Sequence, residues 1–380
     1  MKIRYFPPVT CLLITIAAVG VFLSYSDAVS GNALNAMPRL EVTTVATGLH
    51  NPRGLNFAPT GDLYVAEAAA NGTASGGCGV MGDGSTKCAA NTSSIARIDL
   101  DTGEFTRVIT GLPSLISPDG SANGGSGAQD VVFQGMGNAY VSIGLGGDPG
   151  KREEYFGDAG ANYGRIVRFN PSGKVRFEAD IAGYELENNP DGVVPDSNPY
   201  GLLARDGRLI VADAGGNDLL EVRANGDIST LSVFPPVPRP AQTPPAVQAV
   251  PTSVALGPDG YLYVGQLTGG PFTVGLANVY RVPAGGGERE VAYTGFTNII
   301  DITFGPDGSL YVLEIAQAAI PRFGDGGRIV RIYPNGDREV VLSGPPLIAP
   351  GGIVVDKEDT IYVTNMSTSS TTGAVLRIEQ

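Results

Sequence analysis

One short phrase occurs six times along this sequence. Each copy has a turn containing Gly or Asp, followed by a strand that ends in Tyr-Val or an equivalent pair. One residue per copy serves as a marker: Tyr64, Tyr140, Ile210, Tyr263, Tyr311 and Tyr362. Successive markers are 76, 70, 53, 48 and 51 residues apart. The unit is therefore about 50 residues long, with insertions in the first two copies, and such units bury their apolar faces by stacking on their neighbours.

A repeat of this length predicts the four-stranded blade of a β-propeller. Each unit continues into a second hairpin, such as 95–109, with apolar residues alternating around a turn. The sixth unit ends after its third strand at 374–378, and an extra strand at 40–45 precedes the first unit. We therefore predict an all-β, six-bladed propeller over 38–380, closed where the N-terminal strand completes the last blade and removes an open sheet edge.

The composition excludes several classes of function. The 54 Gly and 28 Pro residues disfavour a helical protein. A formal net charge of −13 argues against nucleic acid as a partner, because phosphates are bound by basic surfaces. With His50 as the only histidine, a zinc or iron site built from several His ligands is excluded. No copper, haem or flavin ligand set is evident in the sequence, and calcium is the cofactor that its carboxylates and amides suit.

The first 28 residues have the layout of a secretory signal peptide. Lys2 and Arg4 precede an apolar run at 9–23, and small and polar residues follow at 24–28. The run is too short to cross a bilayer, so we expect an exported, periplasmic or extracellular protein without a membrane span after cleavage. In an oxidising compartment, Cys78 and Cys88 are expected to form a disulfide in preference to a redox pair or a metal site.

The long insertions all fall on one face of the predicted propeller. In a four-stranded meander, the turn after strand two and the connection between blades lie on the same face. The long segments at these places are 67–93, 111–127, 143–163, 182–198, 235–251 and 266–277. Loops on a rigid scaffold commonly carry binding and catalytic residues, so we place the site at this end of the central channel.

Polar residues gather at the channel mouth expected on this loop-bearing face. They stand three positions after a marker or at the entry to an inner strand. The candidates for substrate binding are Glu67, Arg53, Asp130, Asn198, Tyr200, Gln266, Asn298 and Asn365. A water-filled channel with a solvated polar rim is the alternative interpretation of this pattern.

Three carboxylates and the histidine are the candidates for chemistry. Asp213, Glu314 and Asp301 are candidate acid/base groups, because crowded carboxylates raise one another's pKa. The same three residues are candidate ligands of calcium, which takes six to eight oxygens. His50 lies in the connection into the first blade and is a candidate proton shuttle or a merely exposed loop residue.

Several multi-residue runs resemble the ScyD/ScyE family, named from the biosynthesis of scytonemin, an indole-alkaloid sunscreen. The runs are Gln129–Phe133, Gly144–Pro149, Asp196–Gly201, Ala212–Leu220, Gln266–Phe272 and Gly295–Asp301, and the resemblance extends over roughly 40–380. It implies an exported propeller that acts late in the maturation of a metabolite, and it brings no catalytic motif. The chain departs from the family at Gly270, where a bulky aromatic residue is expected. This difference implies a wider or empty pocket.

Three functions are compatible with these observations. The first is binding or maturation of a small, possibly aromatic, metabolite in a channel pocket lined by aromatic residues such as Tyr163, Tyr184, Tyr200, Phe272 and Phe296. The second is a non-catalytic binding or interaction propeller. The third is a calcium-dependent, lactonase-like hydrolase, an analogy at the level of the fold. The sequence leaves the oligomeric state open.

Overall fold

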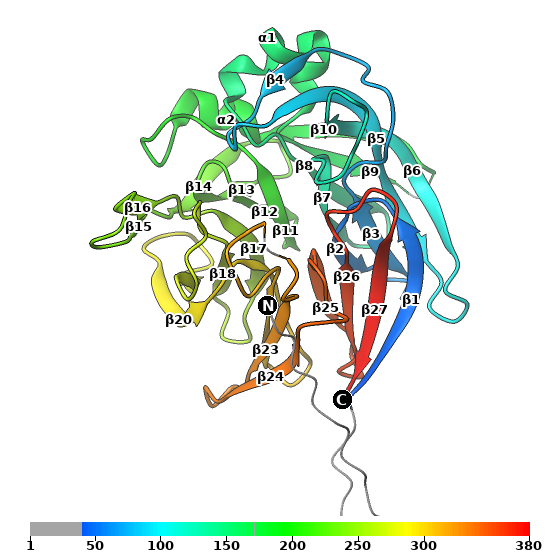
Figure 1. Cartoon of the computed structure of the whole chain (residues 1–380), viewed down its shortest axis with the longest axis vertical. Helices are drawn as coiled ribbons and strands as arrows, with labels where there is room; N and C mark the ends of the chain where they lie inside the picture. Colours follow the sequence, from blue (N-terminus) through cyan, green and yellow to red (C-terminus); the bar gives the residue numbers. More distant parts are fainter. Residues whose placement is uncertain (1–39, 171, 322) are drawn as a thin grey trace, which may run out of the picture. The chain divides into compact units, whose positions relative to one another are not determined.

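Alternating apolar residues around Gly-containing turns form antiparallel hairpins, and these assemble into six sheets around a central axis (Figure 1). The computed structural model describes residues 40–170, 172–321 and 323–380. The predicted six-bladed propeller is confirmed, and Leu40–Gln380 form one compact unit. The predicted signal peptide, 1–28, lies outside the described residues. Within them, no helix is long and apolar enough to cross a membrane.

The first three blades contain most of the insertions. From the inner to the outer strand, blade 1 is β2 (Pro52–Phe57), β3 (Leu63–Glu67), β5 (Thr86–Ile98) and β6 (Phe105–Ile116), with β4 (Cys78–Val80) also paired to β5. Blade 2 is β7 (Ala128–Gln134), β8 (Asn138–Ile143), β9 (Arg165–Phe169) and β10 (Val175–Asp180). Blade 3 is β11 (Pro199–Arg205), β12 (Arg208–Asp213), β13 (Asp218–Val222) and β14 (Ile228–Val233).

The last three blades are more regular. Blade 4 is β17 (Pro251–Leu256), β18 (Leu262–Gln266), β19 (Ala277–Val282) and β20 (Glu290–Phe296). Blade 5 is β21 (Ile299–Phe304), β22 (Leu310–Glu314), β23 (Arg328–Ile332) and β24 (Arg338–Ser343). Blade 6 is β25 (Gly352–Val355), β26 (Ile361–Asn365), β27 (Gly373–Glu379) and β1 (Glu41–Leu49).

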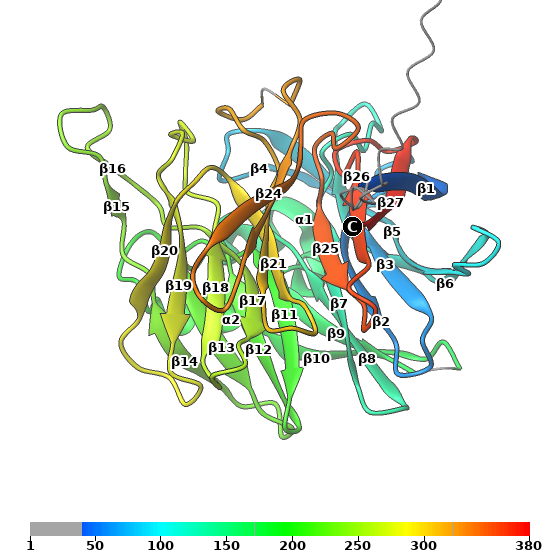
Figure 2. The ribbon, with the colours of Figure 1, turned by 90° about the horizontal axis from the view of Figure 1, so that it is seen from below.

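The ring is closed by the N-terminal strand, as the sequence predicts. Strand β1 pairs antiparallel with β27, with Val42 opposite Ile378 and Thr44 opposite Leu376 (Figure 2). Each inner strand also contacts the inner strand of the next blade, and β25 contacts β2. Because the N-terminal strand belongs to the last blade, the two ends of the propeller chain are held in one sheet.

Aromatic pairs explain why tyrosine recurs in the repeated phrase. Tyr64 packs edge-on against Phe133 of the next blade, with ring centroids 4.9 Å apart. Tyr263 contacts Phe304 of blade 5 at 5.1 Å in the same way. Such pairs between adjacent sheets stabilise their packing beyond the area that they bury. The marker positions therefore belong to the interfaces between blades.

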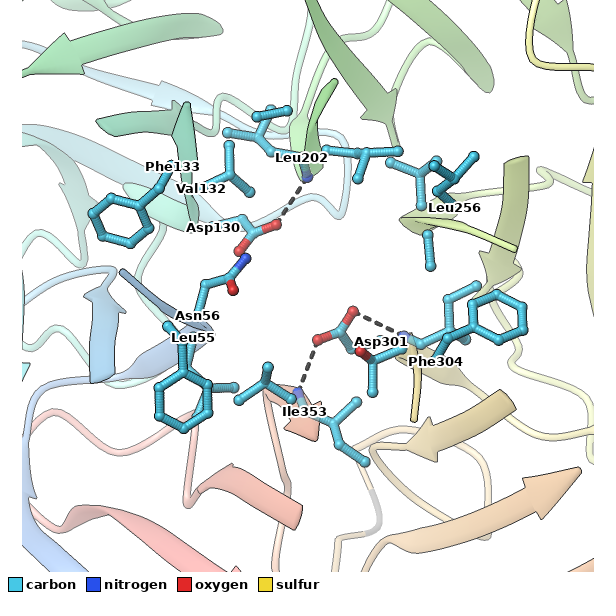
Figure 3. A pocket seen from close by; sticks show the side chains of 18 of the residues that line it. Leu55, Asn56, Asp130, Val132, Phe133, Leu202, Leu256, Asp301, Phe304 and Ile353 are labelled. Carbon is cyan, nitrogen blue, oxygen red and sulfur yellow. Dashed lines mark hydrogen bonds between the residues drawn. The ribbon is translucent and has the colours of Figure 1, made fainter. Parts of the chain in front are cut away.

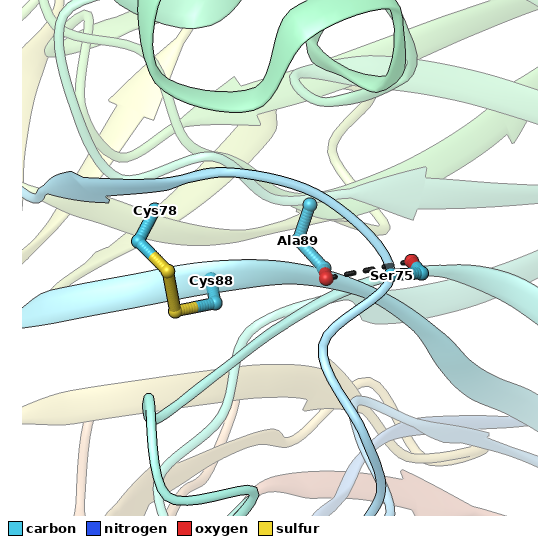
Figure 4. Close-up of a disulfide and its surroundings, with 4 residues drawn as sticks. All are labelled: Ser75, Cys78, Cys88 and Ala89. Carbon is cyan, nitrogen blue, oxygen red and sulfur yellow. Dashed lines mark hydrogen bonds between the residues drawn. A yellow bond between two sulfur atoms is a disulfide. The ribbon is translucent and has the colours of Figure 1, made fainter.

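The insertions form additional structure on the face where the sequence places them. They contain η1 (Pro149–Lys151), α1 (Arg152–Phe156), η2 (Gly157–Asn162), α2 (Ile181–Asn188) and the hairpin of β15 (Val237–Pro238) and β16 (Ala246–Val247). The predicted disulfide is confirmed: Cys78 stands opposite Cys88 in the β4–β5 pair and is bonded to it (Figure 4). Gly79 packs directly on the Tyr155 ring of α1, which leaves no space for a side chain there.

Candidate functional site

The buried glutamates at the ends of the second strands are held by arginines of their own blades. Glu67 accepts hydrogen bonds from Arg107 Nε and Nη2, both at 2.8 Å. Glu314 is paired with Arg328, with 2.9 Å between Oε1 and Nη2. Both glutamate side chains are fully buried. Glu67 and Glu314 are therefore not free acids at a channel mouth, because each compensates a neighbouring guanidinium.

The amide candidates connect loops. Asn365 donates to Pro346 O and accepts from Ile348 N, and Asn298 donates to Ala316 O and Ala318 O. Gln266 Oε1 accepts from Asn278 N, and the main-chain N–H of Asn198 donates to Asp213. These hydrogen bonds hold the amide candidates within the fold. Among the described residues, the buried side-chain atoms of these candidates that lack a hydrogen-bond partner are Gln266 Nε2, Asn298 Oδ1 and Asn198 Oδ1.

His50 belongs to the Glu67–Arg107 pair. Its main-chain N–H donates to Glu67 Oε1 at 2.7 Å, and its ring lies 3.2 Å from Arg107 Nη2. Burial and the positive charge of Arg107 lower the pKa of His50. The ring is therefore neutral at pH 7 and lies beside an ion pair of blade 1.

Two aspartates, Asp130 of β7 and Asp301 of β21, lie on the channel axis. They occupy equivalent positions in blades 2 and 5, which face one another in a ring of six. Asp130 Oδ2 accepts from Leu202 N of the next blade at 2.8 Å, and Asp301 Oδ2 accepts from Ile353 N at 2.8 Å. Each carboxylate thus bonds an N–H on the channel edge of an inner strand (Figure 3).

Small residues make room for the two carboxylates. The equivalent positions in the other four blades are Gly54, Gly201, Ser253 and Gly352. A Cβ at Gly54 would overlap Asp130 Oδ1. Asp130 of β7 therefore lies between Gly54 of β2 and Leu202 of β11.

The structure also brings Arg53 and Tyr200 to the same level of the channel. Tyr200 interacts electrostatically with Arg53, Asp301 and Asp130, and burial is the main cause of its raised pKa. The Tyr200 hydroxyl approaches the Arg53 guanidinium but makes no hydrogen bond of good geometry. Arg53 Nη2 donates to Gly125 O at 3.1 Å. Four of the predicted site residues, from four different blades, thus form one cluster.

Burial controls the protonation of the aspartate pair. It raises the pKa of Asp130 to about 7, although the N–H groups of Leu202 and Val131 act in the opposite direction. Burial and then the charge of Asp130 raise the pKa of Asp301 well above its ordinary value. A carboxyl group with a pKa near 7, such as that of Asp130, can donate and accept a proton near neutral pH.

A cavity of about 420 Å³ lies over the aspartate pair. All six inner strands line it, and Figure 3 shows Asn56 extending into it from β2. The lining residues include Leu55, Asn56, Phe57, Val132, Phe133, Leu202, Leu203, Val254, Leu256, Ile302, Phe304 and Ile353, with Asp130 and Asp301. Most of the lining side chains are thus apolar, whereas polar atoms, including those of the two aspartates, make up much of the surface that the cavity presents.

The cavity lies at the opposite end of the channel from the predicted position of the pocket. Its lining includes the last residues of the inner strands and Pro59 of the following turn, so it opens at the end with the tight turns after strand one. The long loops at the other end hydrogen-bond to one another, as in Gly124 N to Thr368 O and Ser370 N to Asn123 Oδ1. Loop length therefore identified the wrong end of the channel for the cavity.

The aromatic lining is also different from the expected one. Tyr163 and Phe296 are buried in cores shared by adjacent blades, and Tyr184 packs against another core and bonds Thr230. Phe272 and Tyr200 do not line the cavity, which instead contains Phe57, Phe133 and Phe304. A comparison of the inner strands in the six repeats would have indicated this second set, because all three residues occupy one repeat position.

Asp213 lies outside the channel, at the end of β12. Its Oδ1 accepts from the main-chain N–H groups of Asn198, Gly215 and Gly216, and its Oδ2 accepts from Ser197 Oγ. Asp213, Glu314 and Asp301 are therefore in three separate environments and do not form one metal site. In the part of the chain that the structure describes, no three His, Cys, Asp or Glu side chains are arranged as a ready-made metal ligand set.

Comparisons with solved structures agree with the propeller fold. A luciferin-regenerating enzyme matches over 90% of this chain and 96% of its own, at 10% identity and a TM-score of 0.53. A gluconolactonase-like protein matches over 90% and 93%, at 15% identity and a TM-score of 0.50. A structural-genomics protein of unknown function from Bacteroides thetaiotaomicron matches over 90% and 76%, at 10% identity and a TM-score of 0.53. At these identities the likeness establishes the fold alone.

No family model matches the sequence. The search of curated proteins also finds no match. The six-bladed propeller is therefore the level at which known proteins place this chain, and the resemblance to the ScyD/ScyE family stays a prediction.

Proposed function

We propose that this protein binds a small, largely apolar organic molecule in the channel cavity, with a polar group of that molecule on Asp130 and Asp301. The observation that carries this proposal is the combination of a volume of about 420 Å³, mostly apolar lining side chains and two carboxyl groups among them. Binding sites for small molecules typically have this form, with a few polar groups that orient the ligand in an apolar pocket.

The chemistry of the pair specifies the polar group of the ligand. Burial raises the pKa of Asp130 to about 7, and burial and the charge of Asp130 raise the pKa of Asp301 well above the ordinary value of an aspartate. Carboxyl groups with raised pKa values can both donate and accept hydrogen bonds near neutral pH. A hydroxyl or an amine matches this arrangement, whereas a carboxylate would be repelled by any charge on Asp130. A small aromatic metabolite, the class that the ScyD/ScyE resemblance implies, fits these requirements when it carries a hydroxyl or an amine.

Acid–base catalysis at the same site is the second candidate function. It is favoured by one specific observation, the pKa of Asp130 near 7 inside a cavity. A general acid or base is most effective when its pKa is close to the working pH. In this function, Asp130 would exchange a proton with the ligand's hydroxyl or amine while Asp301 remains protonated.

A thermal-unfolding screen with a cavity-filling variant tests the binding proposal. A panel of small aromatic alcohols, amines and carboxylic acids, indole included, is added to the wild type, to Asn56→Phe and to Val340→Phe. Asn56 extends into the cavity, whereas Val340 is exposed on the outer strand β24. A ligand present at 100 times its Kd stabilises by about 2.7 kcal/mol, which corresponds to a Tm increase of roughly 4 °C for a protein of this size.

The expected hits are alcohols and amines that raise the Tm of the wild type and of Val340→Phe but not that of Asn56→Phe. Hits that stabilise Asn56→Phe as strongly as the wild type would show that the ligand binds elsewhere. A panel without hits would contradict a pocket for this class of ligand.

A further inference from the structure

Five carboxylates gather at the loop-bearing end of blade 3, away from the channel cavity. Asp213 ends β12 and Asp218 begins β13, Glu185 comes from α2, and Asp191 and Asp196 follow that helix. The pKa values of these groups are coupled through their charges. None of the ion pairs among the described residues includes any of the five.

The repeat supplies an internal comparison for this cluster. In blade 5, Glu314 ends the second strand and stands opposite Arg328 of the third. In blade 3, Asp213 ends the second strand and stands opposite Asp218. Blade 3 therefore keeps the carboxylate but has a second carboxylate where blade 5 has a guanidinium. Like charges directly opposite one another on paired strands are destabilising.

The buried carboxylates of this cluster differ in the number of hydrogen bonds that they accept. Asp213 accepts hydrogen bonds from four donors. Asp218 is fully buried, and neither of its carboxylate oxygens has a hydrogen-bond partner among the described residues. Glu185 is 1% exposed, and its Oε1 is also without a partner there. Burying a carboxylate without compensation costs several kcal/mol, so these groups must either hold protons or share a positive charge from outside the chain.

Gly216 marks the space between two of the carboxylates. A Cβ on this residue would lie 3.1 Å from Glu185 Oε2 and 3.4 Å from Asp213 Oδ2. Both side chains thus approach one glycine in the short turn between β12 and β13. Burial and the charges of Asp213, Asp191 and Asp196 raise the pKa of Glu185 to about 8, which reflects the same crowding.

We propose that blade 3 binds a Ca²⁺ ion through Asp218 and Glu185, at the place where blade 5 uses Arg328. The acidic side chains that gather here are carboxylates, and calcium prefers carboxylate, carbonyl and water oxygens. Because the described residues present no complete set of three acidic ligands, main-chain carbonyls and water supply the remaining ligands. Asp213 shapes the turn with its four hydrogen bonds and contributes negative charge. The ion stabilises the fold, and this proposal is independent of ligand binding in the channel.

Thermal unfolding of the full protein at pH 8 tests the site. The protein is treated with EDTA and then measured with EDTA, with millimolar CaCl₂ or with millimolar MgCl₂. We expect Ca²⁺ to raise the Tm by roughly 4 °C when the ion is present at 100 times its Kd. Calorimetric titration in two buffers of different ionisation enthalpy should show proton release on binding, because protonated carboxyl groups must ionise to bind a metal.

Three variants locate the ion. Asp218→Asn should abolish the Ca²⁺ response at nearly unchanged side-chain size. Asp218→Arg should also abolish it and should raise the Tm in EDTA above that of the wild type, since it recreates the Glu314–Arg328 arrangement. Asp206→Asn, an exposed carboxylate on the opposite face of the same blade, should retain the response. A wild type that does not respond to Ca²⁺, or an Asp218→Asn variant that still responds, would overturn the proposal.

Discussion

Asp130→Asn should make the protein more stable at alkaline pH and should remove a step from its pH–stability profile. Burial raises the pKa of Asp130 from 3.8 to about 7. Between these values the folded protein holds a proton that the unfolded chain has released, so the free energy of unfolding decreases as the pH rises through this window. A difference of about 3 pKa units corresponds to at most about 4 kcal/mol. Asparagine avoids the cost of burying a charge. Its amide has only one acceptor oxygen for the two N–H groups that bond the carboxylate, however, and this loss offsets about 2 kcal/mol of the gain in stability.

Denaturant unfolding of the wild type and of Asp130→Asn from pH 4 to pH 8.5 measures this effect. The free energy of unfolding of Asp130→Asn minus that of the wild type should increase between pH 4 and 7. This difference should reach about 2 kcal/mol at pH 8 and should no longer change with pH above about 7.5. Titrating groups far from Asp130 cancel in the difference between the two proteins, whereas Asp301 contributes in the same direction because the charge of Asp130 raises its pKa. A difference that is independent of pH, or that changes in favour of the wild type, would refute the assignment of a buried, proton-holding Asp130.

Three further substitutions test other parts of the structure. Glu314→Gln should lower the free energy of unfolding by about 3 kcal/mol, because it leaves the Arg328 guanidinium without its buried partner; denaturant unfolding measures this loss. Cys88→Ser should lower it by about 2–3 kcal/mol through loss of the cross-link while leaving channel binding unchanged; unfolding and ligand titration of the same sample separate the two effects. Gly54→Ala places a methyl group against the Asp130 carboxylate, so it should weaken channel binding at least tenfold; unchanged affinity would disprove the close approach.

The fold was predictable because it follows from local sequence patterns that recur along the chain. The marker tyrosines, the Gly-containing turns and the incomplete sixth unit are each visible in the sequence, and together they require a closed ring. The disulfide was predictable for a similar reason, since only Cys78 and Cys88 remain after the predicted leader. Tertiary context then determines the detail, such as the packing of the β4–β5 hairpin on the Tyr155 ring.

The site was only partly predictable. Arg53, Asp130, Tyr200 and Asp301 were all identified from their positions at the entry to inner strands, and the structure groups them on the axis. The end of the channel that holds the cavity was not predictable from loop length, because long loops can hydrogen-bond to one another while short turns leave the apolar ends of the inner strands open. The environments of Asp218 and Glu185 depend on which strand and helix they face, which one sequence does not reveal.

The most direct test of the channel proposal is a crystal structure of the protein soaked with the tightest alcohol or amine from the thermal screen. We predict electron density for the ligand inside the ring of inner strands, with its hydroxyl or amine within hydrogen-bond distance of the carboxyl groups of Asp130 and Asp301. Density for the ligand among the long loops at the opposite end, with an empty cavity over the aspartates, would contradict the proposed function.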